Sequence, residues 1–211
     1  MLSELSRQLR QRLALPLPGI EAQYQMAHAE RRVNLSRYRI PENVRKGSVL
    51  LLLYEKNGEI MFPLIVRQEY EGVHSGQVAL PGGKYEEEDG TLEYTAIRES
   101  HEEIGIIKRD ISLIGQLTEL YIPPSNFLVQ PFIGTLNYEP TFLPDAKEVA
   151  RVVEISLENL MDEHRVSEKV IKLSNGMEIL TPYFSLRGNV VWGATAMMLA
   201  EMKSVLYEIG Y

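Results

Sequence analysis

Residues 98–105, RESHEEIG, place an arginine and three glutamates within six positions. If this segment is helical, a rotation of about 100° per residue puts Glu99, Glu102 and Glu103 within an arc of about 100°. Each like-charge pair three or four residues apart costs a helix about 0.2–0.5 kcal/mol, and acids in a last turn also oppose the helix dipole. A solvated acidic face tolerates such costs, whereas a partly enclosed face requires a cation.

Two neighbouring features favour the enclosed arrangement. Arg98 can reach back to orient a carboxylate, for which Asp89 is the nearest candidate, and Gly82-Gly83 lets the backbone come close to the helix or to a ligand. Carboxylate oxygens are hard ligands, and without His or Cys in the cluster they suit Mg²⁺ or Mn²⁺. We therefore expect the three glutamates to hold a divalent metal ion.

The elements that must position these side chains can be read from spacing and turn signals. A helix is predicted over 91–104, with Asp89 or Thr91 as its N-cap and Gly105 as its left-handed end. A hairpin is predicted over 169–184, around Asn175-Gly176. A closing helix is predicted over 190–209 and includes Trp192 as a core residue. Strands are predicted over 48–55, 61–67, 77–80, 111–120, 127–138 and 149–157.

Many strands combined with one central and one terminal helix indicate an α/β or α+β layered domain. Leucines at positions 2, 5, 9 and 13 have helical spacing, and two prolines and a glycine follow them. We interpret residues 1–45 as an N-terminal helical extension and 46–211 as a single domain.

Composition excludes several classes of function. The chain of 211 residues carries a formal net charge of −7, which argues against non-specific binding to nucleic acid. It has no cysteine, which excludes disulfides, thiolate catalysis and Cys-based zinc sites. No window has the apolar run of a membrane span, and a cytoplasmic location is expected. The arginines of the first helix could indicate a transit peptide, but Glu4 counts against one.

The segment 82–106, GGKYEEEDGTLEYTAIRESHEEIGI, resembles the Nudix box, here about residues 83–106. Two departures exist: Asp89 stands where a glutamate is expected, with one residue too many before Arg98, and Ser100 replaces an apolar residue. The positions that match by type and order are Gly83, Arg98, Glu99, Glu102, Glu103, Gly105 and Ile106.

This resemblance implies a Nudix-like α/β/α sandwich with a mixed central sheet, in which the box forms a loop, a helix and a loop. It also implies hydrolysis of nucleoside diphosphates linked to another group, with Mg²⁺ or Mn²⁺ held by Glu99 and Glu103 and the site completed by Glu102. The general base is then Glu99 or an acid from a later loop. Glu148 is the main candidate in such a loop, and Glu119 and Asp145 are weaker ones.

Residues 66–83, VRQEYEGVHSGQVALPGG, resemble the signature of the coenzyme A diphosphatase branch, which cleaves coenzyme A to 3′,5′-ADP and 4′-phosphopantetheine. Residues 121–134 and the pair PYF and VWGATAMML are also similar to that branch. Hydrolysis of an ADP-ribose-like compound and a ligand sensor without turnover are the alternatives. The signature is matched at Arg67, Gly76, Pro81, Gly82 and Gly83 and departed from at Ile65, Gln68, Gly72 and Leu80.

Arg67 and Lys84 are the basic residues best placed to meet phosphates near Gly82-Gly83, although each could be a plain surface charge. His74 could contact the substrate, whereas His101 should point away from the glutamates and be structural. The expected partner is a small-molecule nucleotide. The N-terminal extension could support a homodimer.

Overall fold

In the computed structural model, which describes residues 1–33, 40–68, 76–173 and 176–211, the long strand β1 (Arg45–Lys56) lies at the centre of a mixed sheet. It runs parallel to β7 (Phe127–Thr135) and antiparallel to β2 (Glu59–Arg67). The strand order is β3-β2-β1-β7-β5, and β4 pairs with β1, β6 with β7 and β8 with β2. The remaining strands of this sheet are β3 (Val78–Ala79), β4 (Gly82–Lys84), β5 (Ser112–Gln116), β6 (Leu120–Ile122) and β8 (Val149–Ser156).

A second sheet of three strands has the order β11-β10-β9. Its strands are β9 (Val166–Lys172), β10 (Glu178–Leu186) and β11 (Asn189–Trp192). The β9–β10 pair is the hairpin predicted from the sequence, although Asn175 of its predicted turn lies outside the described residues.

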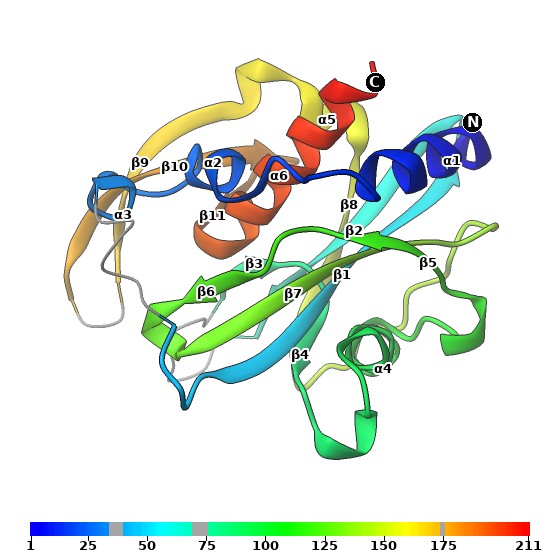
Figure 1. Ribbon diagram of the computed structural model, residues 1–211, viewed down its shortest axis with the longest axis horizontal. Helices are drawn as coiled ribbons and strands as arrows, with labels where there is room; N and C mark the ends of the chain where they lie inside the picture. Colours follow the sequence, from blue (N-terminus) through cyan, green and yellow to red (C-terminus); the bar gives the residue numbers. More distant parts are fainter. Residues whose placement is uncertain (34–39, 69–75, 174–175) are drawn as a thin grey trace.

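Helices cover both faces of the central sheet (Figure 1). The box helix α4 (Leu92–Ile104) lies on one face, and α1 (Leu2–Leu13) and α6 (Gly193–Glu208) lie on the other. The shorter helices are α2 (Gly19–Tyr24), α3 (Ala29–Val33) and α5 (Leu157–Met161). The predicted α/β/α sandwich with a mixed central sheet is thereby confirmed.

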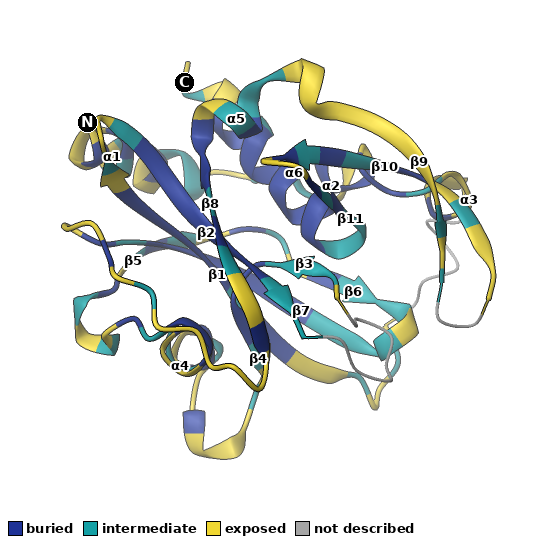
Figure 2. Cartoon of the chain, turned by 180° about the vertical axis from the view of Figure 1, so that it is seen from behind, coloured by how far each residue is buried: buried dark blue, intermediate teal, exposed yellow. Residues whose placement is uncertain are grey.

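Strand β1 explains why the molecule has two cores. Successive side chains of a strand point to opposite faces, and the middle of β1 carries four consecutive leucines, at positions 50–53. Leu51 and Leu53 join the core beneath α1 and α6, whereas Leu50 and Leu52 join the core beneath α4. Figure 2 shows this strand as a buried band through the middle of the molecule.

One predicted strand is divided in the structure, and the predicted closing helix begins later than expected. The strand predicted over 111–120 is divided into β5 and β6, which pair with different parts of β7. The closing helix begins at Gly193 and not at Val190, because Val190 and Trp192 pair with β10. Gly193 has φ +62°, a left-handed conformation that separates the strand from the helix. None of the helices in the described ranges is long and apolar enough to span a membrane.

Candidate functional site

The box helix α4 is fixed at both ends by local sequence. Thr91 is its N-cap, and its side chain accepts a hydrogen bond from the Tyr94 N–H at 3.2 Å. Gly105 ends the helix with φ +76° in the left-handed region. Of the two predicted N-caps, the structure selects Thr91.

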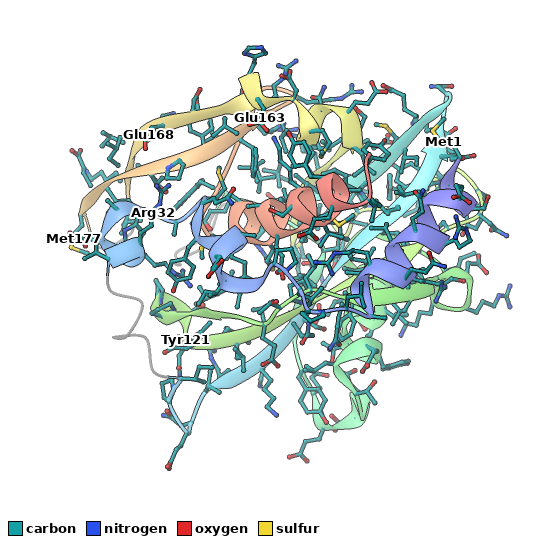
Figure 3. The ribbon with its side chains drawn as sticks, turned by 45° about the horizontal axis from the view of Figure 1, so that its top comes forward. Met1, Arg32, Tyr121, Glu163, Glu168 and Met177 are labelled. Carbon is teal, nitrogen blue, oxygen red and sulfur yellow. The ribbon has the colours of Figure 1, made fainter. Side chains whose placement is uncertain are left out.

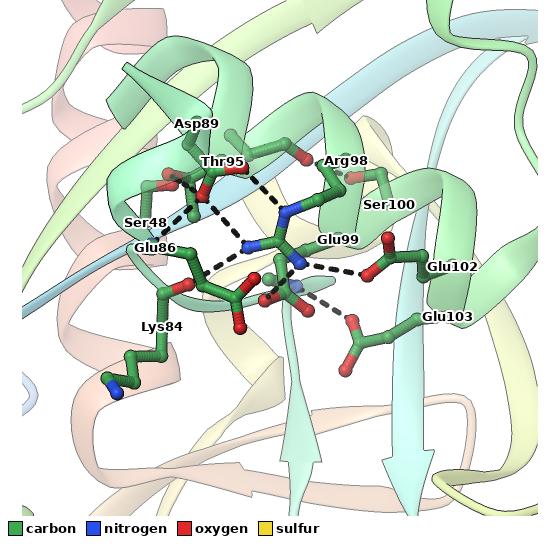
Figure 4. A network of polar contacts seen from close by, with 12 residues as sticks. Ser48, Lys84, Glu86, Asp89, Thr95, Arg98, Glu99, Ser100, Glu102 and Glu103 are labelled. Carbon is green, nitrogen blue, oxygen red and sulfur yellow. Dashed lines mark hydrogen bonds and ion pairs between the residues drawn. The ribbon is translucent and has the colours of Figure 1, made fainter. Parts of the chain in front are cut away.

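Asp89, placed just before the helix, is instead the partner of Arg98. The guanidinium meets both carboxylate oxygens, with Nε–Oδ1 at 2.7 Å and Nη2–Oδ2 at 2.9 Å (Figure 4). Thr95 Oγ1 and the Glu86 N–H also donate to the Asp89 carboxylate. The Arg98 guanidinium holds the pKa of Asp89 well below its ordinary value, with support from these two donors. The sequence prediction that Arg98 reaches back to Asp89 is confirmed.

The remaining guanidinium nitrogen of Arg98 connects two of the predicted metal ligands. Nη1 lies 3.0 Å from Glu99 Oε1 and 2.8 Å from Glu102 Oε2. Nη2 also donates to the Lys84 carbonyl oxygen at 3.0 Å. Arg98 therefore ties the acid-bearing face of α4 to the loop that precedes it.

Glu103 is the most enclosed acid of the three, with 2% of the residue exposed. The Gly82 N–H donates to Oε2 at 2.7 Å, and Arg67 Nη1 lies 3.7 Å from Oε1. Burial raises the pKa of Glu103 to about 8, although Arg67 and the Gly82 N–H oppose the rise. Glu99 and Glu148 add negative charge in the same direction. Arg67 and the Gly82 N–H therefore do not fully offset the cost of burying the charge of Glu103.

The two glycines of β4 allow the backbone to approach both the sheet and the helix. A Cβ at Gly82 would overlap Ser48 and Val49 of β1, and Gly82 has φ +151°. A Cβ at Gly83 would overlap the carboxylate of Glu99. Burial raises the pKa of Glu99 as well, against the opposing effect of Arg98. The fold therefore requires glycine at position 82, whereas glycine at position 83 leaves room for the Glu99 carboxylate.

A cleft of about 1310 Å³ opens in front of these acids. It brings together all nine residues predicted for the site, namely Arg67, Gly82, Gly83, Lys84, Arg98, Glu99, Glu102, Glu103 and Glu148. Glu148 lies in the loop before β8 and acts electrostatically on both Glu99 and Glu103. Glu119 and Asp145 do not line the cleft.

The histidine predictions have separate outcomes. His101 does not line the cleft, and its Nδ1 lies 2.8 Å from the Ile106 carbonyl oxygen, so the structural role is confirmed. His74 and Gly72 lie outside the described residues. His28, which the sequence did not single out, lines the cleft instead.

Several apolar cleft residues were missed from the sequence. Trp192 was predicted as a core residue of the closing helix, but it lies on β11, is only half-buried and lines the cleft. The correction follows from the later start of α6, which leaves Trp192 extended beside Tyr183 of β10. The other apolar lining residues include Leu80, Ile122, Phe127, Ile179 and Met198. Only the resemblance of VWGATAMML indicated that this segment could matter.

The donor set suits a hard divalent cation. Glu99 is half-buried and Glu103 is buried, and burial raises the pKa of both carboxyl groups. Oxygen ligands are what Mg²⁺ and Mn²⁺ prefer. Glu102 is more exposed and is paired with Arg98. Within the described ranges, no three His, Cys, Asp or Glu side chains are gathered as closely as a preformed metal site. The oxygen ligands of Glu99 and Glu103 nevertheless fit such an ion by their chemistry.

Comparison with known proteins places this geometry in context. The model of the NUDIX domain matches residues 44–172. Nudix hydrolase 15, mitochondrial, of Arabidopsis thaliana is 37% identical over 174 residues, covering 78% of this chain and 59% of that protein. Nudix hydrolase 22, chloroplastic, of the same plant is 33% identical over 174 residues, covering 78% of this chain and 56% of that protein. The chain thus spans less than two thirds of these two relatives.

A bacterial relative and two solved structures extend the likeness. The uncharacterized Nudix hydrolase NudL of Photorhabdus laumondii is 28% identical over 165 residues, covering 78% of this chain and 86% of that protein. The crystal structure of the Nudix hydrolase RenU from M. smegmatis has a TM-score of 0.55 at 17% identity, covering 79% of this chain and 88% of that one. A MutT/nudix family protein from Enterococcus faecalis has a TM-score of 0.54 at 16% identity, covering 89% and 73%. At these identities the two structures support the fold alone.

Proposed function

Because this chain belongs to the Nudix family, we propose that it hydrolyses a diphosphate bond in coenzyme A or acyl-coenzyme A with the help of Mg²⁺ or Mn²⁺. The products are 3′,5′-ADP and (acyl-)4′-phosphopantetheine. The observation that carries the proposal is that Arg67 and Lys84 line the same cleft, beside Gly82-Gly83, as the predicted carboxylates Glu99, Glu102, Glu103 and Glu148.

The reaction consumes one water molecule. The water oxygen forms a bond to one phosphorus, the bond from that phosphorus to the bridging oxygen breaks, and the bridging oxygen leaves on the other phosphate. A divalent cation, when bound, supplies positive charge against the phosphate oxygens and lowers the pKa of water at the site. The protein residues must hold that cation, orient the diphosphate and accept the proton of the water.

Each site residue takes one of these tasks in the proposal. Glu99, Glu102 and Glu103 hold the metal ion, and Arg98 orients the first two of them through its Nη1. Glu148 is the proposed proton acceptor, with Glu99 as the alternative.

The diphosphate needs separate contacts with the protein. Arg67 borders the buried Glu103 and Gly82, and Lys84 is an exposed cation on the strand that carries both glycines. Both side chains are proposed to bind phosphate oxygens.

The lining of the cleft favours coenzyme A over a smaller nucleotide. The cleft is also bordered by Leu80, Ile179, Trp192 and Met198. Apolar and aromatic walls suit the pantetheine arm and an acyl chain better than the second ribose of ADP-ribose. This apolar lining joins the resemblance of residues 66–83 as support for the substrate.

A substrate panel tests the proposal. Coenzyme A, ADP-ribose, NADH and Ap4A are incubated with the chain and Mg²⁺, and the products are separated and identified by mass. The expected result is release of 3′,5′-ADP from coenzyme A at a higher kcat/KM than turnover of the other compounds. Preference for ADP-ribose would overturn the substrate and leave the hydrolytic mechanism standing. Tight binding without turnover of any compound would support a sensor instead.

A further inference from the structure

Strand β9 forms an open edge of the three-stranded sheet. The order β11-β10-β9 leaves one side of β9 without a neighbouring strand in the described part of the chain. Residues 166–170 and 172 are all exposed, and Figure 2 shows the strand exposed along most of its length. An exposed edge of this kind offers unpaired N–H and C=O groups to another strand.

The edge also carries an apolar pair that the fold leaves in solvent. Val170 of β9 lies directly opposite Leu180 of β10, so the two side chains share one face of the sheet. They are 54% and 56% exposed. Two large apolar side chains side by side on an open edge are unusual for a strand that stays unpaired, because exposed edges are ordinarily protected by charges, bulges or prolines.

Charges flank this apolar pair in an alternating pattern. Glu168 and Lys172 lie two residues to either side of Val170 on the same face. Lys172 is opposite Glu178 of β10. Among the described residues, neither Glu168 nor Lys172 forms an ion pair within 4.0 Å. Figure 3 shows Glu168 at the outer margin of the molecule.

We propose that β9 pairs antiparallel with β9 of a second copy of this chain, about a two-fold axis through Val170. In that register Val170 faces its own copy, and Glu168 faces Lys172 of the partner subunit at two symmetric positions. One row of side chains then runs from Leu180 through Val170 to the partner's Val170 and the partner's Leu180. The adjacent row alternates in charge from Glu178 through Lys172 to the partner's Glu168.

The charges select this register over its neighbours. An axis through Glu168 would set two glutamates opposite each other, and an axis through Lys169 would do the same with two lysines. Like charges directly opposite destabilise a strand pair. An axis through Ile171 would remove the charge pairs without replacing them. Because a two-fold interface uses the same patch on both subunits, a self-complementary strand is suited to a second copy and not to an unrelated chain.

The natural absence of cysteine makes the axis directly testable. Directly opposite residues in antiparallel strands have Cα atoms about 4.5–5.5 Å apart, within the range that a disulfide spans. The Val170→Cys variant should therefore form a disulfide-linked dimer under mild oxidation, which non-reducing electrophoresis detects. Lys169→Cys is the matched control, because Lys169 would face Ile171 of the partner subunit and should cross-link far less. Equal cross-linking of both variants, or none in Val170→Cys, would overturn the register.

Charge exchange tests the same interface without new covalent bonds. Sedimentation velocity on the full chain should show a concentration-dependent dimer whose dissociation constant rises roughly tenfold or more in Glu168→Lys and in Lys172→Glu. The double variant Glu168→Lys with Lys172→Glu should recover the dimer, because the pairs are restored with reversed sign. Lys169→Glu, which makes the same charge change as Lys172→Glu, should leave the dimer in place. A monomeric wild type, or a dimer indifferent to all four changes, would refute the proposal.

Discussion

Glu103 shows how one side chain carries both a stability cost and the proposed chemistry. It is nearly inaccessible, and its pKa is raised to about 8 because burial disfavours the charged form more than Arg67 and the Gly82 N–H favour it. At neutral pH without a metal ion, the folded chain therefore either holds a proton on Glu103 or carries a poorly compensated charge. A bound divalent cation would remove that cost.

This burial gives a prediction for stability against pH. The ordinary pKa of the group is 4.5, so between about pH 4.5 and pH 8 the folded chain holds more protons at Glu103 than the unfolded chain does. Without added metal ions, the contribution of Glu103 to stability should fall as the pH rises across this range and level off above it. The expected loss is on the order of a few kcal/mol.

The Glu103→Gln variant has no ionisable carboxyl group at this position, so it lacks both the protonation equilibrium and the negative charge. Its Tm at pH 8 without metal ions should exceed that of the wild type, whereas kcat should fall by roughly 100-fold or more. Glu119→Gln changes an exposed acid outside the cleft and serves as the control for both readouts. Thermal scans from pH 5 to pH 9 with EDTA, together with assays in Mg²⁺, measure the two effects. Wild-type turnover in Glu103→Gln would contradict the metal assignment.

Gly83 allows a second residue-scale prediction. A Cβ at this position meets only the far end of the Glu99 side chain, which can move, so Gly83→Ala should fold with little change in Tm. The displaced carboxylate should lower kcat by roughly tenfold or more, because a site residue moved by an ångström loses much of its effect. Gly58→Ala, in the β1–β2 turn far from the cleft, is the control for kcat: it should lower the Tm, because Gly58 has φ +80° and alanine is strained there, but it should leave kcat unchanged. An unaltered kcat in Gly83→Ala would remove Glu99 from the proposed chemistry.

At the scale of elements, the helix α4 and the turn before it act as one positioning unit. The carboxylate of Asp89 accepts from Arg98, Thr95 and the Glu86 N–H, and the side chain of Asp89 is 2% exposed. Arg98 thereby has a fixed orientation from which its Nη1 reaches the acids of the next turn. Relative to the Nudix box, the chain has one extra residue before Arg98. The 3₁₀ turn over Glu87–Asp89 accommodates it and places Asp89 beside Arg98.

Asp89→Asn tests this positioning unit. At pH 7 it should lower the free energy of unfolding by on the order of 1–3 kcal/mol, because the charged partner of Arg98 is lost. The pKa of Asp89 is depressed below its ordinary 3.8, so the wild type gains this stability above about pH 3.8 and loses it as the pH falls further. Denaturant titrations at pH 7 and pH 3 should show a smaller difference at pH 3. The exposed neighbour change Glu88→Gln should cost little at either pH, and an Asp89→Asn variant as stable as wild type at pH 7 would contradict the role.

Local sequence predicted α4, its end at Gly105, the β1–β2 hairpin and the β9–β10 pair, because these depend on contacts between near neighbours. Seven of the nine site residues could be predicted because they lie in one continuous segment, from Gly82 to Glu103, whereas Arg67 and Glu148 lie outside it and were predicted with the help of the resemblance. The cleft walls could not, because Trp192 and Met198 reach the cleft only through the packing of β11 and α6 against the rest of the chain. The split between β5 and β6 likewise depends on which part of β7 each strand meets.

At the scale of the whole molecule, the N-terminal segment is packed into the same core as the sheet. Leu2, Leu5 and Leu9 of α1 join the core that contains Leu51 and the α6 side chains. The buried carboxylate of Glu201 on α6 accepts from Gly19, Gln23 and Thr118, which ties three separate regions together. The division into residues 1–45 and 46–211 stays a prediction, as does a cytoplasmic location.

Leu9→Ala measures how far the N-terminal helix stabilises the remainder. Leu9 is fully buried, so its truncation should lower the free energy of unfolding by roughly 2–5 kcal/mol in a single transition. Leu15→Ala, at a residue that is 59% exposed, should change it by about 0.5 kcal/mol or less. Equilibrium unfolding in urea measures both. A separate early transition, or no loss of stability in Leu9→Ala, would show that residues 1–45 fold apart from the sheet.

Whether the α4 glutamates hold a metal ion is tested most closely by titration of Mn²⁺ into the chain, with the free ion measured by electron paramagnetic resonance. The wild type should bind Mn²⁺ at pH 7.5, and Mg²⁺ should compete for the same site. Glu103→Gln and Glu99→Gln should each weaken that binding by roughly 10- to 100-fold, whereas Glu119→Gln should leave it unchanged. Mn²⁺ binding that is absent from the wild type, or equal in all four proteins, would contradict the assignment of the α4 glutamates to a metal ion.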